Sequence, residues 1–317
     1  MLPFKLVFHP KFNVDLGPHV FPAHKYRMVR KRLLETGVAT EADFVVPAPA
    51  TEADALRVHT AEYLRKIASG DLTSVEARTL EVPWSRSLVE AFFHAAGGTI
   101  LAGRLARRDR CAILIGGGFH HAYPDHGEGF CLLHDVAIAA AALRASSELV
   151  RIAIVDLDVH QGNGTGAILG KDKDTFTVSL HQEHNYPAQK SANTIDIGLE
   201  DGTSDAAYLA ALQEPLRQAL AFGPELLFYL AGADPYEHDT LGALGLSLAG
   251  LRERDRRVFE AARSAGVPVA ATLAGGYAVN PADTVTVHAN TVAAAAEVFG
   301  QGGGPEEQRA PGCVPRN

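Results

Sequence analysis

The sequence predicts a single three-layer α/β/α domain built on a mainly parallel sheet. Short apolar segments rich in Val, Ile and Leu alternate along the chain with longer segments of helical periodicity. The apolar segments are almost continuously hydrophobic, which is typical of strands buried on both faces of a parallel sheet. Strand–helix alternation indicates βαβ units with right-handed crossovers. At 317 residues the chain is long enough to bury a large core.

Seven segments are predicted to be strands because each is a short run of aliphatic and aromatic residues. They are 5–9 (KLVFH), 43–47 (DFVVP), 111–115 (CAILI), 151–156 (RIAIVD), 175–180 (TFTVSL), 225–231 (ELLFYLA) and 268–274 (PVAATLA).

Helices are predicted between these strands. The first covers 25–35, another follows Thr51, whose TEAD segment resembles a capping box, and a long one follows Ser85. Further helices are expected near 134–144, 204–221, 247–265 and 285–299. The catalytic domain is expected to cover residues 1–300. The Gly- and Pro-rich segment 301–317 is predicted to be a disordered C-terminal tail.

Composition excludes several classes of partner. A net charge of −8 argues against nucleic acid, because phosphate binding needs a basic face. No apolar run approaches the roughly 18–20 residues that span a bilayer, and the first residues lack the layout of a signal peptide. Three scattered cysteines (Cys111, Cys131 and Cys313) are too few for a disulfide framework or a Cys-based zinc site, so we expect a reducing compartment, the cytoplasm.

Charged residues gather where strands end, and in parallel sheets ligands bind beyond the carboxyl ends of strands. The apolar run before VDLDVH ends in Asp156, Asp158 and His160, and Asp234 follows a later strand. Taken singly, each aspartate is best interpreted as a helix cap or a member of a buried ion pair. Together, Asp158, His160 and Asp234 would hold a divalent metal and leave one position open for water, as in catalytic sites.

A glycine-rich loop, 116–131, carries the adjacent histidines His120 and His121. Adjacent imidazoles beyond a strand end can act as general base and electrostatic partner, although two surface histidines are an equal alternative for this loop alone. A phosphate-binding loop is disfavoured because the GxGxxG spacing and the Walker lysine are missing. Tyr277, on a Gly-Gly turn after the last strand, can donate its hydroxyl to an oxyanion, although packing is the commoner role of such a tyrosine.

Six segments resemble, in order, those of the histone deacetylase superfamily, which has the arginase/deacetylase fold. They are GGGFHHA (116–122), GFC (129–131), DLDVHQGNG (156–164), VSLH (178–181), AGADPYEHDTLG (231–242) and LAGGY (273–277). The N-terminal segment 9–27 and QEHNYP (182–187) resemble class IV and bacterial members more than class I.

The resemblance implies a set of catalytic roles. Zinc (Zn2+, with Fe2+ as the alternative) would be bound by Asp158, His160 and Asp234. His121 would act as general base and then as general acid, while His120, held by Asp156, would lie close to the developing charge. Tyr277 would polarise the acyl carbonyl.

The resemblance also implies a substrate tube and a second cation site. The tube for a lysine-like methylene chain would be lined by Gly129, Phe130 and Tyr186. A structural potassium ion (K+) would be held by Asp156, Ser179 and the backbone carbonyls of Asp158, His160 and Leu180. Asn163 stands where class I members have a second buried aspartate. Its amide oxygen can fix the imidazole tautomer but carries no full charge, so a less basic His121 is predicted.

The predicted function is zinc-dependent hydrolysis of amides, removing acetyl or longer acyl groups from lysine side chains of proteins. One alternative is deacetylation of acetylpolyamines or other small amides, so the partner is an acylated lysine or another acetylated amine. A non-catalytic acyl-lysine reader is the alternative from another class, although such proteins typically lose the tyrosine, a metal ligand or a tandem histidine. A ureohydrolase would need a further carboxylate and histidine cluster. Neither nucleic acid nor membrane is expected as a partner.

Overall fold

The computed structural model describes residues 1–300 and contains an eight-stranded sheet in the order β2-β1-β3-β8-β7-β4-β5-β6. Every neighbouring pair of strands is parallel. The strands are β1 (Lys5–Val7), β2 (Phe44–Val45), β3 (Cys111–Leu114), β4 (Ile152–Asp156), β5 (Thr175–Gln182), β6 (Ile195–Leu199), β7 (Leu226–Leu230) and β8 (Val269–Thr272). The predicted α/β class is therefore confirmed, and all seven predicted strands are present.

Strand β6 was not predicted from the sequence. It pairs only with β5, at the edge of the sheet, and its residues alternate between partly buried and exposed, with only Leu199 buried. Asp196 and Gly198 interrupt its apolar residues. By contrast, β3, β4, β7 and β8 are buried at every position, which explains their continuous apolarity.

Ten α-helices connect and cover the strands: α1 (Lys25–Glu35), α2 (Glu52–Ala55), α3 (Ala61–Ser69), α4 (Ser74–Leu80), α5 (Arg86–Asp109), α6 (Asp135–Ala145), α7 (Asn163–Leu169), α8 (Asp205–Ala221), α9 (Leu248–Ser264) and α10 (Pro281–Gly300), counted within residues 1–300. The predicted capping box of Thr51 and Asp54 begins α2. Ser85 caps α5 by accepting a hydrogen bond from the backbone N–H of Leu88. The short helices α3, α4 and α7 were not predicted.

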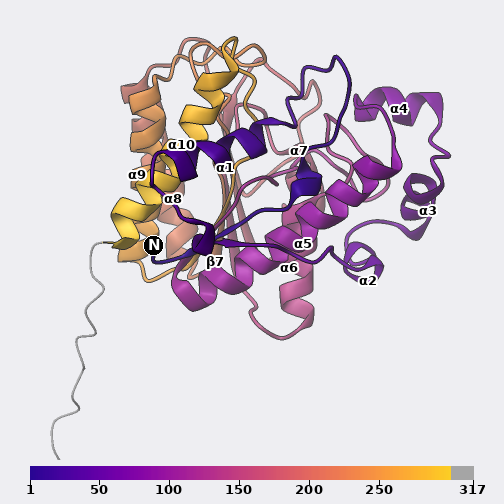
Figure 1. Cartoon of the computed structure of the whole chain (residues 1–317), viewed down its shortest axis with the longest axis horizontal. Coiled ribbons are helices and arrows are strands. Elements are labelled where there is room, and N and C mark those ends of the chain that lie inside the picture. The colour runs from indigo at the N-terminus through magenta and orange to yellow at the C-terminus, as the bar shows by residue number, and fades with distance from the viewer. Residues whose placement is uncertain (301–317) are drawn as a thin grey trace, which may run out of the picture.

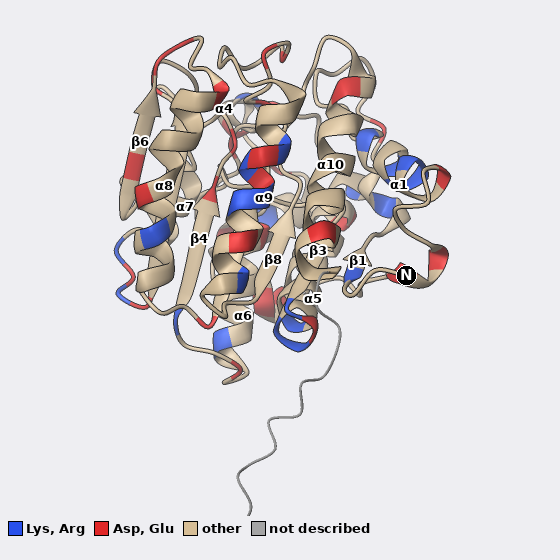
Figure 2. Cartoon of the chain, turned by 90° about the vertical axis from the view of Figure 1, so that its left-hand side faces the viewer, with Lys and Arg blue, Asp and Glu red and all other residues tan. Residues whose placement is uncertain are grey.

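The helices form a layer on each face of the sheet, with α8, α9 and α10 on one side and α5 and α6 on the other (Figure 1). Figure 2 shows α8, α9 and α10 side by side in front of the strands, with charged residues on the outer surface of α9. Ion pairs such as Arg256–Glu253 and Arg256–Glu260 stabilise that exposed surface. Apolar residues face the sheet, so the arrangement follows the predicted three layers.

Because the strands are parallel, their carboxyl ends lie at one edge of the sheet, and the loops after β3, β4, β7 and β8 meet there. These loops carry the predicted site. The predicted C-terminal tail, 301–317, lies outside the described residues. Within residues 1–300, no helix combines the length and apolar character needed to cross a membrane.

Candidate active site

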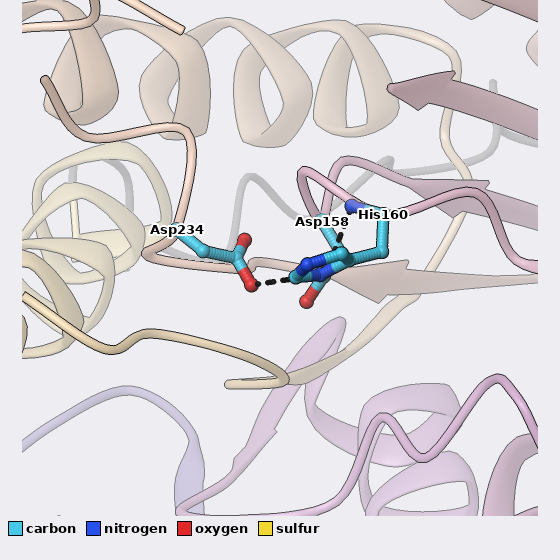
Figure 3. A group of neighbouring side chains, drawn as sticks. All are labelled: Asp158, His160 and Asp234. Atoms are coloured by element: carbon cyan, nitrogen blue, oxygen red, sulfur yellow. Dashed lines mark hydrogen bonds and ion pairs between the residues drawn. The ribbon is translucent and has the colours of Figure 1, made fainter. Parts of the chain in front are cut away.

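Three predicted metal ligands come together at the carboxyl edge of the sheet. Asp158 and His160 follow β4, and Asp234 follows the neighbouring strand β7, where Asp156 lies in register with Leu230. One ligand atom from each of the three lies within 4.8 Å of the others, and all three side chains are buried (Figure 3). The adjacent strands thus bring together residues that are 76 positions apart in the sequence.

The donor set fits a divalent cation. Among the described residues, Oδ2 of Asp234 is buried and has no hydrogen-bond partner, whereas Oδ1 accepts a 2.9 Å bond from the backbone N–H of Val159. Nδ1 of His160 lies 3.0 Å from Oδ1 of Asp158 and 3.6 Å from Oδ2 of Asp234. A buried carboxylate oxygen without a partner is costly, and a cation at this point would satisfy it. Two carboxylates and one imidazole are ligands that suit zinc.

The first tandem histidine is held in a charged state. Nδ1 of His120 lies 2.6 Å from Oδ2 of Asp156, and both side chains are buried. Burial lowers the pKa of His120, but the charges of Asp156 and Asp158 outweigh it and raise this pKa to about 9. Without a metal ion, these carboxylates favour the protonated form of His120, which could stabilise negative charge beside the proposed metal ligands.

The second tandem histidine is neutral. Nδ1 of His121 lies 2.7 Å from Oδ1 of Asn163, so Nδ1 carries the proton and donates it to the amide oxygen. Burial, together with His120 and His160, lowers the pKa of His121 well below its ordinary value. Nε2 is then left as a free proton acceptor. The hydrogen bond to Asn163 itself raises this pKa, so a His121 less basic than with an aspartate partner stays a prediction.

Tyr277 lies on the loop after β8, with its ring centroid 6.5 Å from that of His160. Burial, with Asp158 and Asp234 nearby, raises the pKa of Tyr277 well above its ordinary value, so the phenol keeps its proton and can donate it. The backbone N–H of Tyr277 donates a 2.6 Å hydrogen bond to Oδ2 of Asp239. This role of Asp239 was not predicted, although the residue lies inside the AGADPYEHDTLG segment.

The predicted tube residues line a cavity of about 160 Å³ that also reaches the tandem histidines, Asp158, His160 and Tyr277. Gly129 and Phe130 form a tight turn with left-handed φ values of +50° and +68°. The ring of Tyr186 lies edge-on to His121, with centroids 5.0 Å apart. Phe21 also lines the cavity, with its ring centroid 6.0 Å from that of Phe130. It was not predicted, because a single aromatic residue in an N-terminal loop gives no signal of its own.

The structure also brings together the residues of the predicted potassium site. Asp156 of β4 lies in register with Ser179 of β5, and Leu180 is the next residue. All three are buried. The backbone N–H of Asp158 donates a 3.2 Å hydrogen bond to Oδ1 of Asp156, so this carboxylate also lies next to a predicted zinc ligand.

The sequence is similar to those of several known proteins. A model of the histone deacetylase domain matches residues 19–293. An uncharacterized protein of Picosynechococcus sp. is 39% identical over 298 residues, covering 93% of this chain and 99% of that protein. Histone deacetylase 2 of Arabidopsis thaliana is 35% identical over 272 residues, covering 82% of this chain and 70% of that protein.

The fold is shared as well. The crystal structure of the HDA15 HD domain superposes with a TM-score of 0.78 at 23% identity, covering 93% of this chain and 88% of that one. The sheet, the site at its carboxyl edge and the sequence matches define a hydrolase of the deacetylase class. The chain belongs to the histone deacetylase family, as its motifs predicted.

Proposed function

We propose that the chain is a zinc-dependent amide hydrolase that removes acetyl or longer acyl groups from lysine side chains of proteins. The buried group of Asp158, His160 and Asp234, of which Asp158 and His160 line the cavity, carries this proposal. When bound there, zinc would acidify a water molecule and polarise the acyl carbonyl.

The side chains around the metal ligands supply the proton transfers. The free Nε2 of His121 takes a proton from the attacking water as the oxygen bonds to the acyl carbon. The Tyr277 hydroxyl donates a hydrogen bond to the developing oxyanion, and protonated His120 adds positive charge nearby. When the C–N bond breaks, His121 returns its proton to the leaving amine, which yields the carboxylic acid and free lysine.

The cavity walls determine what can enter. Gly129, Phe130 and Tyr186 would pack against a methylene chain and exclude water around the scissile amide. The acyl-lysine side chain is therefore the partner that we propose. We further propose a structural potassium ion at Asp156 and Ser179, and a cytoplasmic location on the basis of cysteine usage, since Cys111 and Cys131 are buried free thiols.

Acetylpolyamines are a second candidate substrate class. Glu81 lines the same cavity, and a neighbouring groove is lined by both Glu81 and Glu128. Carboxylates at the mouth of the cavity would attract a second amine of a polycationic substrate. A non-catalytic reader is not favoured, because Tyr277, the tandem histidines and all three metal ligands are present.

Substrate comparison tests the proposal. Zinc-reconstituted protein is assayed on an acetyl-lysine peptide, a long-chain acyl-lysine peptide and an acetylpolyamine, with released carboxylic acid as the readout. Turnover of either peptide above the polyamine supports protein deacylation, and the reverse order supports the second candidate. Binding of the peptides without turnover of any substrate would overturn the enzyme proposal in favour of a reader.

A further inference from the structure

An asparagine beside the base creates a problem of orientation. The oxygen and nitrogen ends of its amide have nearly the same shape but opposite hydrogen-bonding character. Only when Oδ1 of Asn163 faces His121 does Nδ1 of the imidazole carry the proton and leave Nε2 free. With the amide reversed, Nδ2 would donate to Nδ1 and the proton would move to Nε2, where His121 could no longer accept one. A carboxylate at position 163 would present an oxygen in either orientation.

The contact on the other end of the amide removes this ambiguity. Nδ2 of Asn163 donates a 2.7 Å hydrogen bond to Oε1 of Glu128, and Asn163 is completely buried. Reversing the amide would place Oδ1 against this carboxylate, so that two acceptors would face each other. A buried acceptor left unpaired beside a charge is strongly disfavoured. The observed orientation is therefore strongly favoured as long as Glu128 is ionised.

Glu128 is both ionised and fixed in place. Burial raises the pKa of its carboxyl, but hydrogen bonds from His126, Asn163 and Tyr186 outweigh burial and hold the pKa below its ordinary value. The Tyr186 hydroxyl donates to the same Oε1 at 3.1 Å. Nε2 of His126 lies 3.4 Å from Oε2. The carboxylate is thus held from three directions.

The backbone of Glu128 is equally constrained. It exchanges two hydrogen bonds with Cys131 across the tight turn, of 3.1 and 2.8 Å. The backbone N–H groups of Gly129 and Phe130 donate to the carbonyls of Thr79 and Leu80 at the end of α4. These contacts tie the turn to a neighbouring helix, so Glu128 has little freedom to follow a reversed amide.

We propose that Glu128 is a positioning residue that sets the orientation of the Asn163 amide and, through it, the tautomer of His121. Glu128 touches the tube residue Tyr186 but reaches the reacting atoms only through Asn163 and His121. The consequence for catalysis rests on the proposed function, because the tautomer of His121 matters there only if His121 is the base. The hydrogen-bonded chain itself is independent of that function.

Glu128→Gln is the informative change, because glutamine keeps the shape of glutamate but does not favour one orientation of the Asn163 amide. Its amide can accept from Nδ2 of Asn163 or, after reversal, donate to Oδ1 equally well. ¹⁵N NMR of the imidazoles in metal-free protein, with His121 assigned from the spectrum of His121→Ala, reports the tautomer directly. We expect Nδ1–H in the unmodified chain and a substantial fraction of Nε2–H in the variant. An unchanged tautomer in Glu128→Gln overturns the proposal.

The double variant Glu128→Gln with Asn163→Asp provides a rescue. The introduced glutamine amide can then donate to a carboxylate that accepts from His121 in either orientation, so the Nδ1–H tautomer should return. A purely structural role for Glu128 would not be rescued by moving the carboxylate to position 163. Glu225→Gln is the matched control for the tautomer measurement. Glu225 accepts backbone hydrogen bonds from Val150 and Arg151 at the amino ends of the strands, away from the site.

Turnover separates this inference from the proposed function. In zinc-loaded protein, Glu128→Gln should lower kcat several-fold with little change in KM, and the double variant should recover most of the loss. A changed tautomer without hydrolysis in any variant would leave the positioning role standing and refute the proposed function. Normal hydrolysis by the original chain, together with an unchanged tautomer in Glu128→Gln, would refute the positioning role alone.

Discussion

The position that a Cβ atom on Gly129 would take lies 2.8 Å from Cδ2 of His121 and 2.8 Å from Cε1 of Tyr186. The glycine therefore occupies the space between the proposed base and the opposite wall of the tube. No larger residue fits there unless one of these rings moves. The same residue has a φ of +50°, which L side chains adopt only with strain.

Gly129→Ala should accordingly impair substrate entry as well as stability. We expect kcat/KM to fall by at least an order of magnitude (about 1.4 kcal/mol), because the methyl group displaces the His121 ring or narrows the tube. The backbone strain should lower the free energy of unfolding by about 1–2 kcal/mol. Steady-state kinetics and urea unfolding measure the two effects.

Gly37→Ala is the matched control for this experiment. Gly37 also has a left-handed φ, of +70°, but no atom lies within 4 Å of its Cβ position. It should show a comparable loss of stability and unchanged kinetics. Equal kinetic losses in both variants would mean that strain, not obstruction of the tube, explains the effect of Gly129→Ala.

Tyr277→Phe should remove the donor to the oxyanion and leave the fold intact. Loss of one such donor typically lowers kcat by about 10²–10³-fold, and KM should change little because the ring still lines the cavity. Tyr236→Phe, which removes a hydroxyl 3.4 Å from Asp283 outside the cavity, is the control and should retain its activity. A Tyr277→Phe enzyme with undiminished kcat would show that the hydroxyl has no part in the reaction.

Buried His59 should make the fold sensitive to acid. Its Nδ1 donates to the carbonyl of Tyr123 at 3.0 Å, and its Nε2 accepts from the backbone N–H of His134 at 3.1 Å. Protonation of Nε2 therefore breaks the hydrogen bond from His134. Burial lowers the pKa of His59 from 6.5 to about 4. In the unfolded chain this imidazole binds a proton more tightly than in the folded chain, so acid favours unfolding. The contribution of His59 to the free energy of unfolding is therefore fully present above pH 6.5 and is lost as the pH falls toward 4.

Unfolding free energies measured across this pH range test the effect. His59→Gln offers a donor and an acceptor without a titrating group and should reduce the slope of unfolding free energy against pH by up to about 1.4 kcal/mol per pH unit. Other buried histidines whose pKa is lowered will keep part of the slope, namely His121, His134, His181 and His288. His24→Gln, at an exposed histidine, serves as the control. An identical slope in His59→Gln and the original chain would contradict the assignment.

Arg254 of α9 should be important for stability, because it is a fully buried cation. Its Nη1 donates to the carbonyls of Leu157 and Gly232, at 3.2 and 2.7 Å, and its Nε donates to Asp255 at 2.9 Å. These carbonyls lie in the loops that carry the proposed metal ligands. Arg254→Met would leave buried Asp255 with the hydroxyl donors Tyr229 and Thr291 but without its cationic partner, and should cost about 3–5 kcal/mol of unfolding free energy.

Arg256→Met on the same helix is the comparison. Arg256 pairs with Glu253 and Glu260 on the exposed surface, where such pairs contribute less than about 1 kcal/mol. In thermal or urea unfolding, the loss of unfolding free energy in Arg254→Met should therefore be several times that in Arg256→Met. Similar losses at both positions would contradict a special role for the buried guanidinium group.

The sequence predicts the parts of the molecule in which local pattern and environment agree. Strand β4 is buried on both faces, so its apolar run and the polar residues after it are visible as a strand and a site. Strand β6 lies at an edge and carries Asp196, so its pattern is too weak to recognise. The three proposed metal ligands could be grouped from the sequence because the carboxyl ends of parallel strands converge, which needs no knowledge of loop conformation.

Contacts made by loops could not be predicted in this way. Glu128, which reaches Asn163, precedes a turn with two left-handed φ values, and Phe21 reaches the cavity from a segment without regular structure. Asp239 holds Tyr277 across two different loops. In each case the partner is far away in the sequence, and no period or spacing records the pairing.

Metal content and turnover measured together on Asp158→Ala are the decisive test of the proposed metal site. We expect the original chain to bind one zinc ion tightly at this site and to hydrolyse an acetyl-lysine peptide, and Asp158→Ala to lose both the ion and the activity while remaining folded. Normal hydrolysis by Asp158→Ala, with or without bound zinc, would contradict the assignment of the site.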